Sequence, residues 1–169
     1  MKRFLLYSTF VGVIVATFML TSYQTTVAGE FPVETGPAKF MRDHDKAMEE
    51  SKKTGKPVFA FFQEIPGWHG CKVFGRQVMT DPAIIDAVEN SFVPLLIINN
   101  TRRGNDSQIL KKYNEPSWNY QVIRFLDHNG KDVIPRKDGV NVKKLLANRM
   151  IQALEKAGKP VPDSLKEVK

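Results

Sequence analysis

The sequence contains a single cysteine, Cys71, among its 169 residues. One thiol excludes an internal disulfide, so the chain is not a small scaffold held together by disulfides. The sequence also lacks a phosphate-binding glycine loop, a Ser-His-Asp arrangement with supporting context, and a metal motif of several cysteines. It has no internal repeat and no low-complexity tract. These absences remove the function classes that such motifs identify, and we expect no cofactor.

The sequence has one long, mostly apolar run, the 17 residues from Phe4 to Leu20. A basic start precedes this run, and the small residues Thr26-Val27-Ala28 follow it, which is typical of a secretory signal peptide. We expect residues 1–28 to be removed; the alternative is an N-terminal anchor, since the run could almost span a bilayer. Either way, the domain is expected outside the cytoplasm, periplasmic or secreted, with membrane contact only if the segment stays uncleaved.

The remaining composition is typical of one ordinary globular domain, with 42% apolar residues, 25% charged residues and 11 Phe. Without residues 1–28, the formal charge falls from +7 to about +5. The Lys and Arg residues are spread along helix-like faces, which favours a solvated surface over a nucleic-acid groove. We therefore expect no nucleic-acid partner.

Alternating helix and strand patterns predict an α/β domain over residues 29–157, with a leader strap at residues 31–37 and a loose basic tail at residues 158–169. Amphipathic spacing with Pro and Gly boundary signals predicts helices at about residues 43–54, 71–79, 82–90, 107–113 and 141–156. Apolar β-rich runs predict strands at residues 58–62, 92–98 and 121–126, and a hairpin returning over residues 131–134.

The segment from Phe59 to Lys72, FAFFQEIPGWHGCK, carries the candidate site. It brings Cys71 to the point where a Pro/Gly loop becomes a helix, and the positive end of a helix dipole should lower the pKa of a thiol there. His69 could also lower this pKa, relay a proton, or share a soft metal such as Cu(I) with Cys71. The alternative is an inert core thiol, because free cysteine is among the most buried residue types.

The order of the elements resembles the thioredoxin fold, most strongly that of exported thioredoxin-like proteins. Five short motifs carry the resemblance: Lys56-Pro57, Cys71-Lys72, Asp81-Pro82, Phe92-Val93, and Asp127 with Gly130-Lys131. They cover most of the mature domain. The resemblance implies a three-layer α/β sandwich in which helices flank a mixed central sheet of about four to five strands.

Two positions depart from the pattern of that family. The spacing from Cys71 to Asp81-Pro82 aligns Cys71 with the second cysteine of the family's Cys-x-x-Cys motif, so Trp68 stands where the attacking first cysteine would be. Gln121 stands at the position of the family's cis-proline. The candidate catalytic residues are Cys71, His69 and Lys72, and the candidate substrate-binding residues are Trp68, Gly70, Trp118 and Gln121.

Three hypotheses follow from this degenerate Trp68-His69-Gly70-Cys71 site. We favour thiol redox work by Cys71, as a monothiol exchanger or in an intermolecular disulfide, because a dithiol mechanism needs a second, resolving thiol. Its partners would be protein thiols or small-molecule thiols. The second hypothesis is a redox-inactive protein-binding module that uses the same loop. The third is a carrier of copper or another soft metal that uses His69 and Cys71.

Overall fold

The computed structural model describes residues 31–118 and 120–169. The expected signal peptide, residues 1–28, lies outside these residues and stays a prediction. Among the helices that the structure describes, none has the length and apolar character needed to cross a membrane.

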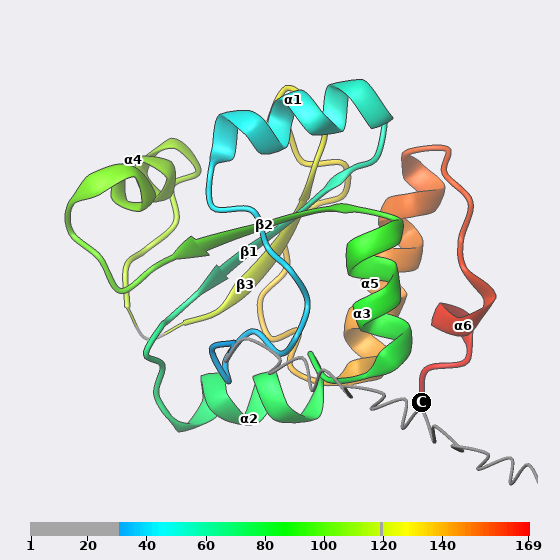
Figure 1. Cartoon of the computed structure of the whole chain (residues 1–169), viewed down its shortest axis with the longest axis horizontal. Coiled ribbons are helices and arrows are strands. Elements are labelled where there is room, and N and C mark those ends of the chain that lie inside the picture. The colour runs from blue at the N-terminus through cyan, green and yellow to red at the C-terminus, as the bar shows by residue number, and fades with distance from the viewer. Residues whose placement is uncertain (1–30, 119) are drawn as a thin grey trace, which may run out of the picture.

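A mixed sheet of three strands in the order β2-β1-β3 forms the centre of the described chain (Figure 1). Strand β1 (Val58–Gln63) pairs in parallel with β2 (Val93–Ile98) and antiparallel with β3 (Val122–Leu126). All six residues of β1 are buried. This burial explains its continuous apolar sequence, because a central strand covered on both faces shows no polar alternation.

The predicted number of strands, four to five, is corrected to three within the described residues. Two isolated bridges flank the sheet: Met41 to Leu95, in a segment for which the sequence predicts no strand, and Leu126 to Asp132, in the predicted strand at residues 131–134. The first segment stops pairing because Asp43, two residues after Met41, already caps a helix. The second is followed by Pro135, which has no N–H to donate to a ladder.

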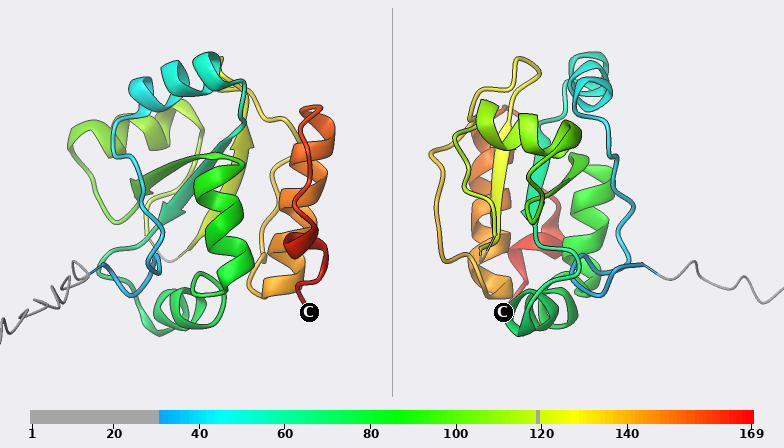
Figure 2. Two further views of the ribbon diagram at one scale, coloured as in Figure 1. Left: turned by 45° about the vertical axis from the view of Figure 1, so that its right-hand side comes forward. Right: turned by 90° about the vertical axis from the view of Figure 1, so that its left-hand side faces the viewer.

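Helices cover both faces of the sheet (Figure 2). The first face packs against α1 (His44–Thr54) and α4 (Gly104–Lys112), and the second against α2 (His69–Gln77), α3 (Pro82–Asn90) and α5 (Lys143–Lys156). Along β1, Ala60 and Phe62 enter the first core, whereas Phe59 and Phe61 enter the second. This alternation confirms the predicted three-layer sandwich.

The strap, residues 31–37, crosses α2. At the crossing, a Cβ atom on Gly75 would lie 1.8 Å from the backbone oxygen of Val33. Glycine at this position therefore lets the strap approach the helix backbone directly. The contact places Glu34, which is 3% exposed, beside the start of α2.

The C-terminal segment differs from the loose tail expected over residues 158–169. It contains the short helix α6 (Asp163–Lys166), whose Leu165 is 1% exposed and belongs to the core formed with α3 and α5. Val161 and Val168 pack against the same core. The apolar residues of this basic segment are spaced to cover that core, which the charge of the segment does not reveal.

Candidate functional site

The site begins in the loop between β1 and α2. The backbone N–H of Ile65 donates to Asn100 Oδ1 at 3.2 Å, and Asn100 Nδ2 donates to the Pro66 carbonyl at 3.3 Å. The Ile65-Pro66 peptide bond is cis. Trp68 then takes the N-cap position of α2 without a side-chain cap bond, so Cys71 lies in the first turn of this helix.

Cys71 is nearly inaccessible, with 1% of its surface exposed. Its thiol donates to Glu64 Oε2 across 4.0 Å. Burial raises the pKa of the Cys71 thiol above its ordinary value, and the negative charges of Glu64 and, to a smaller extent, Glu34 raise it further. The expectation that the helix terminus lowers this pKa is therefore wrong, because burial and two nearby acids outweigh the helix dipole. At neutral pH the thiol is protonated.

The two acids reach the site from different segments. Glu34 comes from the strap, and its Oε1 accepts the backbone N–H of Gly67 at 2.8 Å. Gln63 joins the segments, because its Nε2 donates to the Glu34 carbonyl at 3.1 Å and its Oε1 accepts the Glu64 N–H at 3.1 Å. Sequence reasoning missed both acids. Glu64 stands inside the quoted site segment and could have been noticed, whereas Glu34 has no local signal.

Gly67 leaves the space in which this arrangement fits. A Cβ atom at this position would lie 2.6 Å from Cys71 Cβ, 2.6 Å from the Glu64 carbonyl oxygen and 3.0 Å from Glu34 Cγ. Any larger residue would push the strap or the helix away from the loop. The Pro/Gly composition that pointed to a site in the sequence thus has a steric cause.

A groove of about 440 Å³ opens beside Cys71. It lies between α2, the residues that lead into β3, and residues 139–142 before α5. Four predicted site residues, Trp68, Gly70, Cys71 and Gln121, line it. Among the lining residues that the structure describes, none is charged. The groove is therefore an uncharged surface that ends at a thiol.

The other predicted residues lie outside the groove lining. His69 is exposed at the first position of α2, and Lys72 is half-buried, its backbone N–H donating to the Trp68 carbonyl at 3.2 Å. The guanidinium carbon of Arg102 lies over the Trp118 ring, 4.9 Å from the ring centroid. The structure therefore places Trp68, and not Trp118, beside the thiol.

Tyr120 is a groove residue that sequence reasoning missed. Its hydroxyl donates to Glu115 Oε2 at 2.6 Å, and burial together with this hydrogen bond raises the pKa of the phenol. No short motif signals this contact, because it depends on the return of the chain into β3.

The geometry gives little support to the soft-metal hypothesis. Within residues 31–118 and 120–169, no group of three or more His, Cys, Asp and Glu side chains is arranged to hold a metal ion. A metal shared by His69 and Cys71 would therefore need ligands from another molecule.

Comparisons with known proteins agree with the architecture. The structure of a protein described as DsbH oxidoreductase superposes with a TM-score of 0.57 and 15% identity, covering 75% of this chain and 90% of that chain. A thioredoxin from Thermus thermophilus superposes with a TM-score of 0.58 and 17% identity, covering 72% of this chain and 91% of that chain. At these identities the likeness shows the fold.

No curated protein matches the sequence. A family model described as thioredoxin-like matches residues 39–127, which is more than half of the chain and includes β1, the site loop and α2. The chain therefore belongs to the thioredoxin-like family.

Proposed function

We propose that this protein acts outside the cytoplasm and exchanges disulfides through Cys71 alone, with protein thiols or small-molecule thiols as partners. A thioredoxin-like fold with a single cysteine at the start of α2 fits thiol redox chemistry. The observation that carries the proposal is the position of Cys71 in the lining of the uncharged groove, where a bound disulfide would meet the thiol.

The exchange needs one protein thiol and one external thiol. Cys71 first loses its proton, for which Glu64 Oε2, at 4.0 Å, is a placed acceptor. The thiolate then attacks one sulfur of a bound disulfide, forming a mixed disulfide while the other half leaves as a thiolate with the electron pair. Trp68 occupies the other cysteine position of the family motif, so the chain has no second thiol, and an external thiolate must attack the mixed disulfide and restore Cys71.

The groove indicates what kind of partner segment it accepts. Trp68 and Val142, exposed by 58% and 54%, stand at its margins and are two of the exposed large apolar side chains in the described part of the molecule. Exposed apolar groups beside a hollow favour contact with another molecule. We propose a segment without charged side chains next to its disulfide, because the groove lining gives no counter-charge.

A second candidate function is a redox-silent binding module that uses the same groove. The near-complete burial of Cys71 and the raised pKa of its thiol favour it, since both reduce the fraction of accessible thiolate. In this case Cys71 is part of the groove surface and exchanges no disulfide.

Glutathione disulfide separates the two candidates. We would incubate the folded protein, the urea-denatured protein and the Cys71→Ser variant with it at several pH values and follow adducts by intact mass. Monothiol exchange predicts an adduct on the folded wild type that forms faster as pH rises toward the raised pKa of the folded Cys71 thiol, because the thiolate fraction grows. A Trp68→Cys variant is the positive control, because it restores the two-cysteine spacing of the family.

If only the denatured protein forms the adduct, Cys71 is a core residue and the binding-module function replaces the proposed one. Export is tested separately, by determining the first residue of the protein isolated from its own cells. Cleavage near Ala28 supports export, and an intact Met1 in protein found in the cytoplasm contradicts it.

A further inference from the structure

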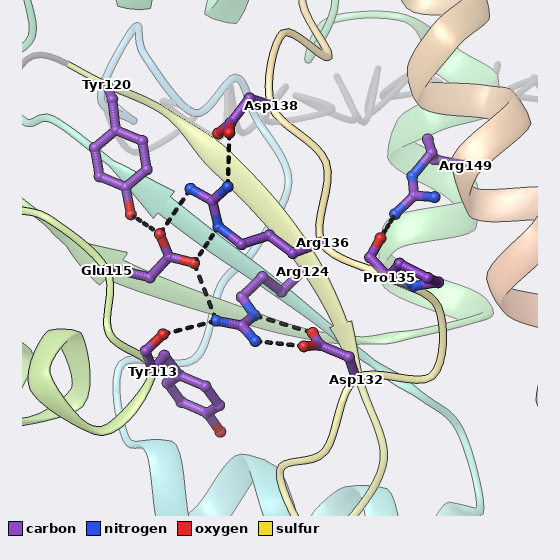
Figure 3. Close-up of polar contacts among 9 residues, drawn as sticks. All are labelled: Tyr113, Glu115, Tyr120, Arg124, Asp132, Pro135, Arg136, Asp138 and Arg149. Carbon is purple, nitrogen blue, oxygen red and sulfur yellow. Dashed lines mark hydrogen bonds and ion pairs between the residues drawn. The ribbon is translucent and has the colours of Figure 1, made fainter.

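Two segments far apart in the sequence form the side of the groove that faces α2. The first wall consists of Tyr120 and Gln121, at the start of β3, and the second wall consists of residues 139–142, before α5. Figure 3 shows that the Glu115 carboxylate is bonded both to Tyr120, of the first wall, and to Arg136, which precedes the second.

The Glu115 side chain is fully buried and is surrounded by donors. Its Oε2 accepts the Tyr120 hydroxyl at 2.6 Å and Arg136 Nη2 at 2.9 Å. Its Oε1 accepts Arg136 Nε at 2.6 Å and Arg124 Nη1 at 3.0 Å. Four charge-assisted hydrogen bonds hold this one buried carboxylate. Loss of any donor would leave its buried charge less well compensated, so the arrangement resists rearrangement.

The first wall contacts this carboxylate directly, and the second is linked to it through Arg136 and Asp138, which precede it in the chain. On the first wall, Tyr120 lines the groove and its hydroxyl donates to Glu115. On the side of the second wall, Arg136 Nη1 donates to Asp138 Oδ2 at 2.8 Å. Asp138 immediately precedes Gly139, the first residue of that wall. The Arg136 guanidinium lies 6.0 Å from the Tyr120 ring centroid, so the two side chains that bind Glu115 also interact with each other.

We propose that Glu115 is a positioning residue that joins the two walls through Tyr120 and Arg136 and thereby fixes the width of the groove over Cys71. This inference rests on the proposed function where it concerns disulfide exchange. It predicts that breaking the connection loosens the groove without touching the thiol. Tyr120 then selects which disulfides reach Cys71, although it takes no part in the bond exchange.

Tyr120→Phe is the sharpest variant, because it keeps the ring in the groove and removes one hydroxyl from Glu115. Tyr113→Phe is its matched control. The Tyr113 hydroxyl is 2.8 Å from His44 Nε2, near the N-terminus of α1, and Tyr113 does not line the groove. Glu115→Gln is a second test variant, which keeps the shape of the side chain and removes its charge.

The first readout compares two disulfide probes with the same leaving group. One is an uncharged cysteine-containing pentapeptide joined to thionitrobenzoate, and the other is methanethiol joined to thionitrobenzoate. Attack by Cys71 on the peptide or methyl sulfur releases the coloured thionitrobenzoate anion. We expect the wild type to prefer the peptide probe, and Tyr120→Phe and Glu115→Gln to reduce this preference by about tenfold, the effect of one hydrogen bond to a charged acceptor. Tyr113→Phe should keep the preference.

The second readout is the rate at which iodoacetamide alkylates Cys71 in each folded variant. The rates are compared under conditions in which the variants have the same free energy of unfolding. A loosened groove predicts faster alkylation in Tyr120→Phe than in Tyr113→Phe. If the wild type reacts with neither disulfide probe, the proposed exchange function fails, and this alkylation rate still decides the role of Glu115. Equal alkylation rates in Tyr120→Phe and Tyr113→Phe, or an unchanged probe preference in a reactive protein, would overturn the inference.

Discussion

The thiol of Cys71 is subject to two opposing influences at the start of α2. The helix N-terminus favours the thiolate, whereas burial and the charges of Glu64 and Glu34 favour the protonated thiol. The raised pKa shows that the second influence is the stronger. A groove that leads to a protonated thiol stays unreactive until the proton is removed, which suits an exchanger that reacts slowly with unselected disulfides.

The raised pKa of Cys71 predicts a pH-dependent stability. An unfolded cysteine loses its proton near pH 8.5, whereas the folded chain holds the proton to higher pH. Above about pH 8.5 the native state therefore binds more protons than the unfolded state, and the free energy of unfolding falls as pH rises through the folded pKa. Urea denaturation at pH values from about 7.5 to 9.5 should show this fall in the wild type and a smaller one in Cys71→Ala. Parallel curves for the two proteins would contradict the raised pKa.

Single residues differ in how visible they are to sequence reasoning. Cys71, Trp68 and Gly70, which line the groove, can be singled out from the sequence because the loop that presents them is continuous in sequence. Glu115 stands beside Asn114 and Pro116, a pattern typical of an exposed loop. It is buried because Arg124 and Arg136, which come later in the chain, return to neutralise it. A buried charge whose partners are distant in sequence gives no local signal.

At the scale of elements, the strap and α2 depend on one close contact. Gly75→Ala would place a methyl group 1.8 Å from the Val33 carbonyl oxygen, so the strap must move. We expect a net loss of about 1 to 2 kcal/mol in the free energy of unfolding, because overpacking costs more than the gain in helix propensity. Chemical denaturation measures this loss.

Gly70→Ala is the control for this change in the same helix. Its new Cβ would meet the Trp68 ring at 2.9 Å, and that ring is 58% exposed and can rotate into solvent. We expect stability within about 0.5 kcal/mol of the wild type, as for an ordinary surface substitution. A loss as large as that of Gly75→Ala would show that backbone freedom, and not the strap contact, explains the glycine at position 75.

The elements with strong local signals are those that the sequence predicts best. Asp43 and Asp81 accept N–H groups of the first turns of α1 and α3, as expected of N-cap residues. The apolar runs of β1 and β2 are strands. The returning strand at residues 131–134 was overestimated, because whether an edge strand continues there depends on the following Pro135 and not on the β propensity of the segment.

At the scale of the whole molecule, two segments outside the repeating helix and strand pattern complete the structure. The strap supplies Glu34 to the site, and the C-terminal segment places Leu165 in the core against α3 and α5. In Figure 1 the C-terminal segment lies on the outer side of α5. The domain of residues 29–157 that the sequence suggested therefore leaves an apolar surface uncovered if residues 158–169 are removed.

Leu165→Ala tests whether the C-terminal segment is part of the folding unit. Leu165 is 1% exposed, so truncating it should lower the free energy of unfolding by about 2 to 4 kcal/mol through lost burial and a residual cavity. Lys166→Ala is the matched control in the same helix, because it removes an exposed ion pair with Asp163, which contributes little to stability. Urea denaturation followed by tryptophan fluorescence and by circular dichroism would measure both. If Leu165→Ala is as stable as Lys166→Ala, the segment only rests on the domain, and residues 29–157 are sufficient to fold.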